Sequence, residues 1–355
     1  MPETVCVTIV TYNSRAYLEP CLEAVFQQNH HLLEVVVVDN ASTDGTRAML
    51  ARFEDRIRVE YNDRNIGFAA AQNQAIRLSV SDWVLALNPD VVLEPGFIEQ
   101  LVEAAAIDGR VGTVCGRLRA IGRDLMPAAV DFIDTAGIYF APSMRHFDRG
   151  SGEPDDGRFR RMEYVFGASA AAALYRRETI ADVSHDGHFF DPDFFTYRED
   201  ADVAWRAQLL GWRCLYVPGA AGYHVRSVRP GPRNVVPGVL NMHSVKNRFL
   251  MRIKNATGGL YWRFWLPATA RDVLVVGGCL LWEWRSLPAF WHIVRCLPRA
   301  LRERRWIMRR RRVDDRSLAR WFSLEPAAEP IADAVEAGDR VIPLVDAAAC
   351  NAVPR

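Results

Sequence analysis

The chain has 355 residues, of which 50% are hydrophobic and 25% are charged. This balance excludes collagen-like, disordered and multi-span membrane proteins, and the length suits about two domains. The formal net charge is only +1, so no overall field favours nucleic acid as a partner.

The first 95 residues alternate between strand and helix patterns. Apolar runs predict strands at residues 5–10, 35–38 and 83–87, and a further strand is expected at 58–61. Apolar residues at helical spacing predict three helices, at about 17–26, 46–53 and 69–78. Such alternation predicts a parallel sheet, in which ligands bind beyond the carboxyl ends of the strands. The polar residues that follow three of these strands are therefore expected to share one crevice.

The middle of the chain is less regular. A helix is expected at 97–106, a loop rich in Gly, Asp and Arg at 145–161, a second helix at about 200–210, and a strand at 213–217 that runs towards His224. Seven cysteines without a C-x-x-C pair favour a reducing compartment over a disulfide framework or a thiolate zinc site. The N-terminus has no basic region before its apolar run, so no signal peptide is expected.

The last third differs in composition. The character of the chain changes after about residue 236: six tryptophans lie among aliphatic residues and arginines between residues 262 and 306, and residues 295–312 hold nine arginines and one glutamate. The longest uncharged apolar stretch, 273–282, is too short for a membrane span, which needs about 20 residues. The expected organisation is a catalytic domain at 1–235, a helical Trp/Arg-rich extension at 236–326 and a poorly ordered tail at 327–355.

Carboxylates at two strand ends suggest ligand binding. Asp90, in Asn88-Pro89-Asp90, suits a hard divalent cation, although the same residues also form turns. Asp39 can accept a hydrogen bond from a nucleotide ring or ribose, or it can cap the following helix. Thr11 and Tyr12 follow the first strand and could contact the same nucleotide.

A second group of carboxylates begins the helix predicted at 200–210. Glu199, Asp200 and Asp202 could supply a general base, or could simply complement the helix dipole. Nearby aromatic residues, including Tyr197 and Trp205, could form a platform for a sugar or belong to the core. His224 could bind a ligand, although an isolated loop histidine usually does not.

Five short motifs occur in order along the chain: Val7-Thr8-Ile9-Val10-Thr11-Tyr12-Asn13, Val37-Val38-Asp39-Asn40-Ala41-Ser42-Thr43-Asp44-Gly45, Asn65-Ile66-Gly67-Phe68-Ala69, Leu87-Asn88-Pro89-Asp90 and Glu199-Asp200-Ala201-Asp202. Together they resemble bacterial family 2 glycosyltransferases, and most closely the rhamnosyltransferase-like enzymes of cell-surface polysaccharide assembly. The resemblance covers about residues 4–226 and continues weakly to about 312. It implies the GT-A fold, a Rossmann-like α/β fold whose mixed, mostly parallel sheet is flanked by helices.

The resemblance also implies an activity, the inverting transfer of a sugar from a nucleotide diphosphate to a hydroxyl of a lipid-linked saccharide. Rhamnose from dTDP-rhamnose is the preferred donor, and a UDP-hexose or UDP-hexosamine is the alternative. A catalytically silent, membrane-associated scaffold is a further alternative, against which the presence of both the base and the metal carboxylate counts.

The resemblance assigns roles to individual residues. The donor would be bound by Thr11, Tyr12, Asn13, Asp39, Asn40, Arg64, Asn65, Gly67, Asn73 and Asn88. Mg²⁺ or Mn²⁺ would be held by Asp90 and His224, with fewer charged ligands than in many members because Asn88 replaces an aspartate. Asp200 would be the base, with Glu199 as its rival. The acceptor would contact Tyr197, Asp202 and Trp205, and Asp202 is spaced to pair with Arg206.

The Trp- and Arg-rich extension suits an anionic membrane surface, because aromatic rings lie at headgroup level and arginines pair with anionic lipids. Since the family usually extends lipid-linked saccharides, a peripheral location at the cytoplasmic face of the membrane is expected. The alternative is a helical packing domain with a solvated basic face. No nucleic-acid partner is expected, and the oligomeric state is not predicted.

Overall fold

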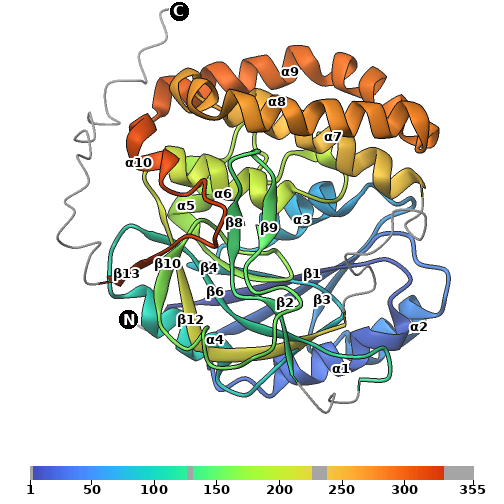
Figure 1. Ribbon diagram of the computed structural model, residues 1–355. Coiled ribbons are helices and arrows are strands. Elements are labelled where there is room, and N and C mark those ends of the chain that lie inside the picture. Colours follow the sequence, from blue (N-terminus) through green and yellow to red (C-terminus); the bar gives the residue numbers. More distant parts are fainter. Residues whose placement is uncertain (1–2, 126–130, 226–237, 332–355) are drawn as a thin grey trace, which may run out of the picture.

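The computed structural model describes residues 3–125, 131–225 and 238–331 (Figure 1). A mixed sheet of eleven strands forms its centre, with the order β13-β10-β12-β6-β11-β4-β1-β2-β3, while β5 pairs with β12 and β7 with β6. The strands are β1 (Val5–Thr11), β2 (Leu33–Asp39), β3 (Arg58–Tyr61), β4 (Trp83–Leu87), β5 (Val91–Leu93), β6 (Val111–Ala120), β7 (Phe132–Thr135), β10 (Glu163–Val165), β11 (Ala172–Arg176), β12 (Arg213–His224) and β13 (Ala328–Pro330). A separate hairpin joins β8 (Ile138–Phe140) to β9 (His146–Asp148).

Helices cover both faces of the sheet, which confirms the predicted fold class. Helices α1 and α4 lie on one face, and α3, α5 and α6 lie on the other (Figure 1). The helices are α1 (Arg15–Phe26), α2 (Thr46–Leu50), α3 (Phe68–Arg77), α4 (Phe97–Ala105), α5 (Arg177–Val183), α6 (Glu199–Leu209), α7 (Gly238–Asn255), α8 (Gly258–Leu281), α9 (Pro288–Arg310) and α10 (Asp315–Ala319), with short 3₁₀ turns η1 (Ala51–Phe53), η2 (Pro192–Phe194) and η4 (Trp284–Ser286).

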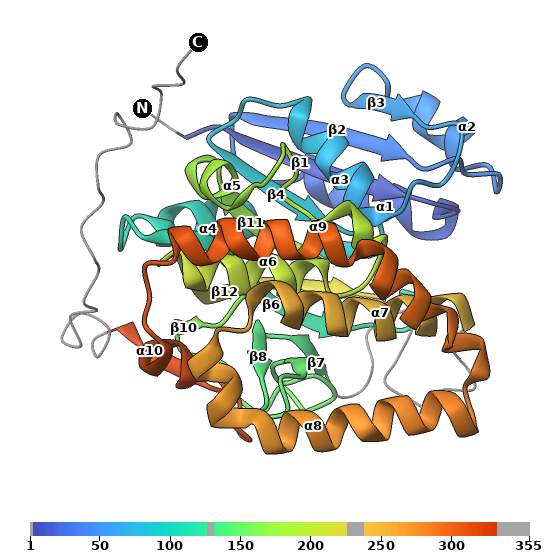
Figure 2. The same ribbon diagram turned by 90° about the horizontal axis from the view of Figure 1, so that it is seen from above.

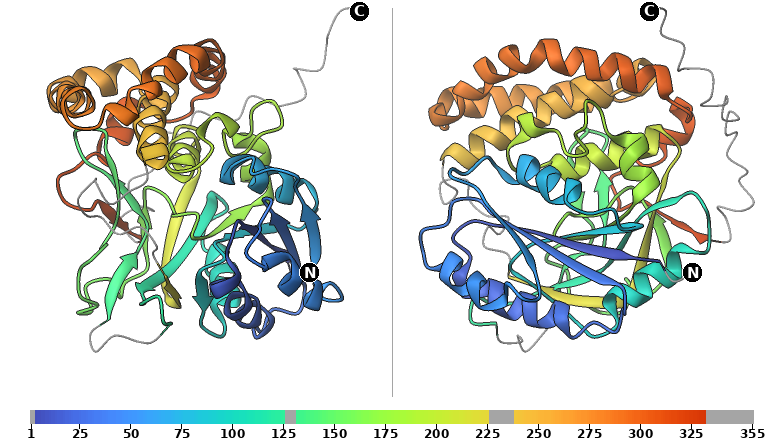
Figure 3. Two further views of the ribbon diagram at one scale, coloured as in Figure 1. Left: turned by 90° about the vertical axis from the view of Figure 1, so that its right-hand side faces the viewer. Right: turned by 180° about the vertical axis from the view of Figure 1, so that it is seen from behind.

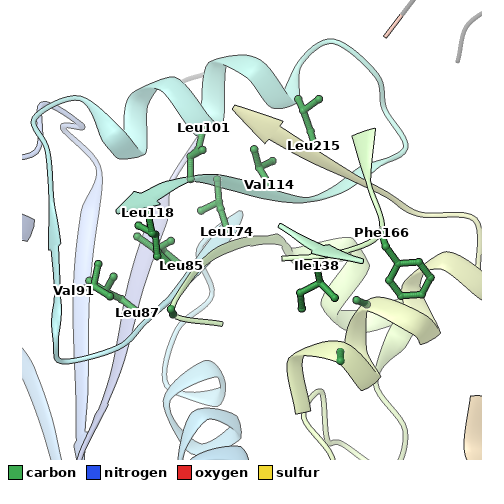
Figure 4. Close-up of a cluster of buried hydrophobic side chains, with 14 of the residues drawn as sticks. Leu85, Leu87, Val91, Leu101, Val114, Leu118, Ile138, Phe166, Leu174 and Leu215 are labelled. Atoms are coloured by element: carbon green, nitrogen blue, oxygen red, sulfur yellow. The ribbon is translucent and has the colours of Figure 1, made fainter. Parts of the chain in front are cut away.

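The parallel half of the sheet determines where a ligand can bind. Strands β3, β2, β1 and β4 are parallel neighbours, and Thr11 is in register with Asp39 at the ends of β1 and β2. Every residue of β1 and β4 is buried, as expected for strands covered on both faces. Apolar side chains from β4, β6, β11, β12 and α4 fill the core beneath this edge (Figure 4). The predicted convergence of polar strand ends is therefore built on a rigid, buried sheet.

Two expectations from the sequence need correction. The last strand does not stop at residue 217, because a register shift between Val217 and Ala221 lets β12 continue to His224. The tail expected from residue 327 begins with β13, which pairs with β10. Residues 332–355 of that predicted tail lie outside the described residues.

The C-terminal helices share the main hydrophobic core. Leu250 and Met251 of α7 and Ala300 and Ile307 of α9 belong to the same buried cluster as β1 and β4. Helices α8 and α9 form an outer layer on the side of α6 and α7 away from the sheet (Figure 3). Helix α7 packs against α6 and α9 packs against α7, so these C-terminal helices extend the core of the sheet outwards.

Helix α8 is longer than the apolar stretch predicted from the sequence. Within the described ranges it is the one helix long and apolar enough to cross a membrane, judged by length and composition only. The charged residues Arg271 and Asp272 interrupt its apolar sequence. The longest uncharged stretch is for this reason shorter than the helix and too short to cross a membrane by itself.

Candidate active site

A cavity of about 370 Å³ opens beside the carboxyl end of β4. Its walls come from the strand ends, the loop before α6, the β9 strand and α7, and they are formed by Phe68, Asn88, His146, Asp148, Ser169, Ala170, Ala171, Thr196, Tyr197, Arg198, Glu199, Asp200, His224 and Ser244. The structure thus brings together Asn88, Tyr197, Glu199, Asp200 and His224, five residues to which the sequence assigned roles.

Glu199 and Asp200 differ in their electrostatic surroundings. Burial raises the pKa of Asp200 to about 6, and the negative charge of Asp148 adds to this effect. The backbone N–H groups of Ala170 and Ala201 donate to Asp200, at 3.2 and 2.7 Å. Burial and the adjacent Asp200 raise the pKa of Glu199 further, to about 8. At neutral pH Asp200 is therefore the ionised member of the pair, which favours it as the base.

The backbone before these carboxylates is strained. Phe195, Tyr197 and Arg198 all have positive φ angles, between 64° and 72°, which side-chain-bearing residues rarely adopt. Asn247 of α7 holds this loop, since its side-chain amide donates to the carbonyls of Phe194, Thr196 and Tyr197 at 2.7 to 2.9 Å. Helix α7 therefore helps to fix the position of the candidate base.

His224 lies between two carboxylates. Its Nδ1 is 2.7 Å from Asp134 Oδ2, and its Nε2 is 3.3 Å from Asp90 Oδ1. Burial alone would lower the pKa of His224, but the hydrogen bonds to Asp134 and Asp90 raise it to about 9. Asp134 fixes the orientation of the ring, so that Nε2 faces Asp90, as in many metal-binding histidines.

Asp39 and Thr11 form a buried polar pair at the ends of β2 and β1. Asp39 Oδ2 accepts hydrogen bonds from Ser42 N (3.1 Å) and from Arg47 Nε (2.7 Å). Among the described residues, neither Asp39 Oδ1 nor Thr11 Oγ1 has a hydrogen-bond partner, although both are buried. Buried polar atoms are normally paired, so these two atoms are suited to a polar ligand.

Asn40 organises the neighbouring loop. It donates to Asn65 Oδ1 (3.1 Å) and to the carbonyl of Gly67 (3.2 Å), and it accepts from Ile66 N. Gly67 has a φ angle of +86°, and a Cβ there would lie 2.5 Å from the ring of Phe195. Only glycine allows this loop to pack against the loop that carries the candidate base.

Three residues with predicted roles have side chains that contact the rest of the fold and do not line the cavity, and their roles stay predictions. Asn73 bonds the backbone of Phe189 and Phe190. Asp202 is fully buried and forms ion pairs with Lys254 and with Arg206, the latter as the spacing predicts. Trp205 is buried among the rings of Phe140, Phe166 and Phe322. Helical geometry explains the positions of Asp202 and Trp205. Helix α6 presents Glu199 and Asp200 at its start to the cavity, and the residues that follow face the protein interior.

The remaining predicted residues of the donor site lie nearer the surface. Tyr12 is half exposed, Arg64 is exposed, and Asn13 uses its side-chain oxygen to accept from Thr43 N. These positions leave Tyr12 and Arg64 accessible beside Asp39.

Several residues that shape the site were missed by sequence reasoning. Asp134 and Asp148 belong to short strands in a stretch without clear periodicity, and Ser244 and Asn247 belong to the extension. Arg198 could have been noticed, because it directly precedes the two carboxylates. The others carry no local signal, since their importance depends on contacts across the fold.

Comparison with known proteins agrees with this geometry. The family model for "Glycosyl transferase family 2" matches residues 6–184 of the 355. A relative from Mycobacterium tuberculosis, named N-acetylglucosaminyl-diphospho-decaprenol L-rhamnosyltransferase, is 26% identical over 302 residues, which cover 79% of this chain and 94% of the relative. A poly-beta-1,6-N-acetyl-D-glucosamine synthase from Staphylococcus aureus is 22% identical, over 61% of this chain and 48% of its own length.

Solved structures show the same fold at low sequence identity. The mannosyltransferase PcManGT from Pyrobaculum calidifontis, in complex with GDP-Man and Mn²⁺, superposes with a TM-score of 0.51 at 18% identity, covering 87% of this chain and 84% of its own. S. aureus TarS 1-349 with UDP-GlcNAc gives 0.52 at 15% identity, covering 89% of each chain. The family match and this shared fold agree: the chain belongs to glycosyl transferase family 2 and is a glycosyltransferase.

Proposed function

We propose that this chain is an inverting glycosyltransferase that moves a sugar from a nucleotide diphosphate to a hydroxyl of a lipid-linked saccharide. The observation that carries the proposal is the pair of adjacent carboxyl groups, Glu199 and Asp200, in a cavity beside the polar ends of the parallel strands. dTDP-rhamnose is the preferred donor, and the support for it is the rhamnosyltransferase relative at 26% identity.

In this mechanism Asp200 removes the proton from the acceptor hydroxyl as its oxygen attacks the anomeric carbon. The bond between that carbon and the diphosphate oxygen breaks on the opposite face, and the nucleoside diphosphate leaves with the electron pair. Configuration at the anomeric carbon is therefore inverted, and one carboxylate is sufficient. Glu199, with its higher pKa, stays protonated at neutral pH and keeps a second negative charge away from Asp200.

The nucleoside would occupy the edge formed by β1 and β2. Asp39 Oδ1, buried and without a described partner, is placed to accept a hydrogen bond from a ring N–H of the base. Tyr12 is exposed beside it and offers a stacking surface. Asn40, Asn65 and Gly67 form the loop that faces the ribose and diphosphate.

The residues present fit a divalent metal ion. Asp90 and His224 Nε2 face each other, and Asp134 orients the imidazole. No three His, Cys, Asp or Glu side chains come together as a metal site within the described ranges. A two-ligand site suits Mg²⁺ or Mn²⁺, which commonly bind one or two protein groups together with substrate phosphates. When bound, the ion would neutralise the charge of the leaving diphosphate.

Replacing Asp90 with alanine is expected to weaken Mg²⁺-dependent donor binding by about tenfold or more, because the substitution removes one of two protein ligands. Calorimetric titration of the nucleotide sugar, with Mg²⁺ and with EDTA, measures this effect. Asp55→Ala, at an exposed carboxylate, is the matched control. Equal metal dependence in Asp90→Ala and wild type would remove the metal role.

A panel of nucleotide sugars tests the donor assignment. Donor hydrolysis and binding should be measured with dTDP-rhamnose, UDP-glucose, UDP-N-acetylglucosamine and GDP-mannose. We expect dTDP-rhamnose to be preferred, and preference for a UDP-sugar would select the alternative donor. If the folded protein binds no donor, the proposed transfer is wrong.

We further propose a peripheral location at the cytoplasmic face of the membrane. An apolar surface runs along α8, η4 and α9, where Trp262, Trp282, Trp284 and Trp291 are each at least 66% exposed. The arginine run contributes less than its composition suggests, because many of its side chains bind protein groups: Arg299, Arg304, Arg310, Arg311 and Arg312. Trp306 likewise packs against His185 instead of facing solvent. The support for membrane binding is therefore chiefly the exposed aromatic residues, with Arg263, Arg285 and Arg295 exposed beside them.

Replacing Trp282 and Trp291 together with serine is expected to weaken binding to anionic vesicles by about tenfold or more, because two large apolar side chains no longer enter the interface. Co-sedimentation with phosphatidylglycerol vesicles measures the affinity. Val80→Ser, at a residue that is 96% exposed in a different part of the fold, is the control. Unchanged co-sedimentation of the double variant would contradict this docking surface.

A further inference from the structure

Arg198 is a half-buried cation, and in the part of the chain that the structure describes no carboxylate is among its hydrogen-bond partners. It lines the cavity and donates to the carbonyl and hydroxyl of Ser244, at 3.0 and 3.2 Å. Its third partner is Nδ1 of His146, at 2.9 Å. A guanidinium largely removed from water is unfavourable unless negative charge lies close to it, so this position is suited to an anionic ligand in addition to the nearby Asp200.

Two more arginines follow Ser244 along α7. Arg248 and Arg252 are one and two turns further on, and both are largely buried. Among the described residues they share a single carboxylate, that of Asp272 on α8, and the Arg248 contact is long, at 3.4 Å. Within the described ranges, the carboxylate of Asp272 is therefore the one counter-charge shared by the guanidinium groups of Arg248 and Arg252.

Arg145 and Arg271 complete an arginine cluster with these three residues. Arg145 lies in the turn between β8 and β9, and Arg271 lies on α8. Burial and the positive charges of Arg248, Arg145 and Arg271 together lower the pKa of Arg198 to about 9, against the opposite effect of the negative Asp200. Arg198 is the member of the cluster that lines the cavity, and the charges of Arg145, Arg248 and Arg271 act on it there.

The cluster lies between the cavity and the apolar surface. Helix α8 lies at the side of the molecule farthest from β2 and β3, with β8 and α7 nearer the sheet (Figure 2). Contacts give the same order: Arg198, at the cavity, binds Ser244 of α7, Arg248 of α7 binds Asp272 of α8, and α8 also carries the exposed side chains of Leu266, Val273 and Leu274.

We infer that the arginine cluster binds the diphosphate of the lipid-linked acceptor, an inference that rests on the proposed function. A sugar hydroxyl, a diphosphate and a hydrocarbon chain follow one another in such an acceptor, in the same order as the three regions. The donor diphosphate would instead lie at the wall formed by Asn88, Asp90 and His224. Arginine suits this role because its planar fork binds phosphate oxygens in pairs.

Binding of inorganic pyrophosphate tests the cluster directly. Calorimetry in EDTA keeps Asp90 and His224 from holding a metal–diphosphate complex. In Arg145→Gln/Arg271→Gln, pyrophosphate affinity should fall by about tenfold or more, since two charge-assisted contacts are lost. Arg52→Gln, at an exposed arginine of η1, should bind as wild type does. Equal affinity in wild type and the double variant would overturn the inference.

The conservative variant Arg145→Lys/Arg271→Lys separates charge from structure. It keeps both positive charges, so it should bind pyrophosphate within a few-fold of wild type if the cluster acts on the anion. Loss of binding as large as in the glutamine variant, with a lowered Tm in both, would mean that the arginines only stabilise the fold.

Steady-state kinetics identify the source of the diphosphate. The glutamine variant should raise KM for a lipid-diphosphate-linked saccharide by about tenfold or more, and leave KM for the donor and for a neutral alkyl glycoside unchanged. A raised donor KM would place the donor diphosphate at the cluster and contradict the inference. A wild type that transfers no sugar would contradict the proposed function, whereas an active wild type whose variant keeps the acceptor KM would contradict this inference alone.

Discussion

Replacing Asp200 with asparagine is expected to lower the rate of sugar transfer by about 10²- to 10⁴-fold, the usual contribution of a general base. Asparagine has nearly the same shape, and its one side-chain oxygen can still accept from either Ala170 N or Ala201 N, the two groups that donate to separate oxygens of Asp200, so the loop should largely keep its structure. Nucleotide binding should be nearly unchanged, because Asp39 and Thr11 lie at a different strand edge. Release of nucleoside diphosphate measures the rate, and calorimetry measures binding.

Glu199→Gln is the matched control. Glutamine resembles the protonated form in which Glu199 exists at neutral pH, since its pKa is raised to about 8. This variant should therefore keep most of its activity at pH 7. The opposite pattern, an active Asp200→Asn and an inactive Glu199→Gln, would make Glu199 the base.

The same assignment predicts how the rate depends on pH. A base acts only when deprotonated, and burial raises the pKa of Asp200 to about 6. The rate should consequently be nearly constant above that pH and fall by about tenfold for each unit below it. A rate that stays constant down to pH 4, the usual range of an exposed aspartate, would contradict the buried, raised pKa.

Replacing Lys254 with methionine is expected to destabilise the protein by about 3–5 kcal/mol, the typical cost of removing one partner from a buried ion pair. Lys254 is 1% exposed, and its Nζ contacts Asp191 Oδ2 (2.6 Å), Asp202 Oδ2 (3.0 Å) and Glu303 Oε2 (2.9 Å). Burial alone would lower the pKa of Lys254, but these carboxylates hold it above its usual value. Without the ammonium group, three buried carboxylates would lose their common counter-charge.

Thermal and urea unfolding measure this loss. Arg52→Met is the control, because the Arg52–Glu19 ion pair is exposed and such pairs contribute about 0–1 kcal/mol. A Lys254→Met protein as stable as this control would show that Arg206 and Arg299 alone neutralise the network. Since the network joins η2, α6, α7 and α9, its loss should also loosen the loop that Asn247 holds, and activity should fall at temperatures where the fold persists.

Much of the fold could be read from the sequence. The central residues of β1, β2 and β4 are almost all apolar, and such runs are typical of a sheet buried on both faces. Alternation with helices then fixes parallel pairing, which brings Thr11, Asp39 and Asn88 to one edge. The five motifs identified the family for the same reason, since each occupies a strand end or a helix start. The roles given to Asp90, Asp200 and His224 stay predictions.

The tertiary structure decided what local patterns could not. Sequence spacing did not show that Asp202 and Trp205 of α6 lie away from the cavity. It also did not show that the side chain of Asn73 forms hydrogen bonds with the backbone of Phe189 and Phe190. Asp134 meets His224 across 90 positions of sequence, and Lys254 meets Asp191 across 63. The sequence by itself determined the strands, the helices and the chemistry at their ends, because these depend on short-range patterns of hydrophobicity. Burial, the pKa of Asp200 and the placement of the arginine cluster depend on which distant segments pack together, and only the folded chain determines that.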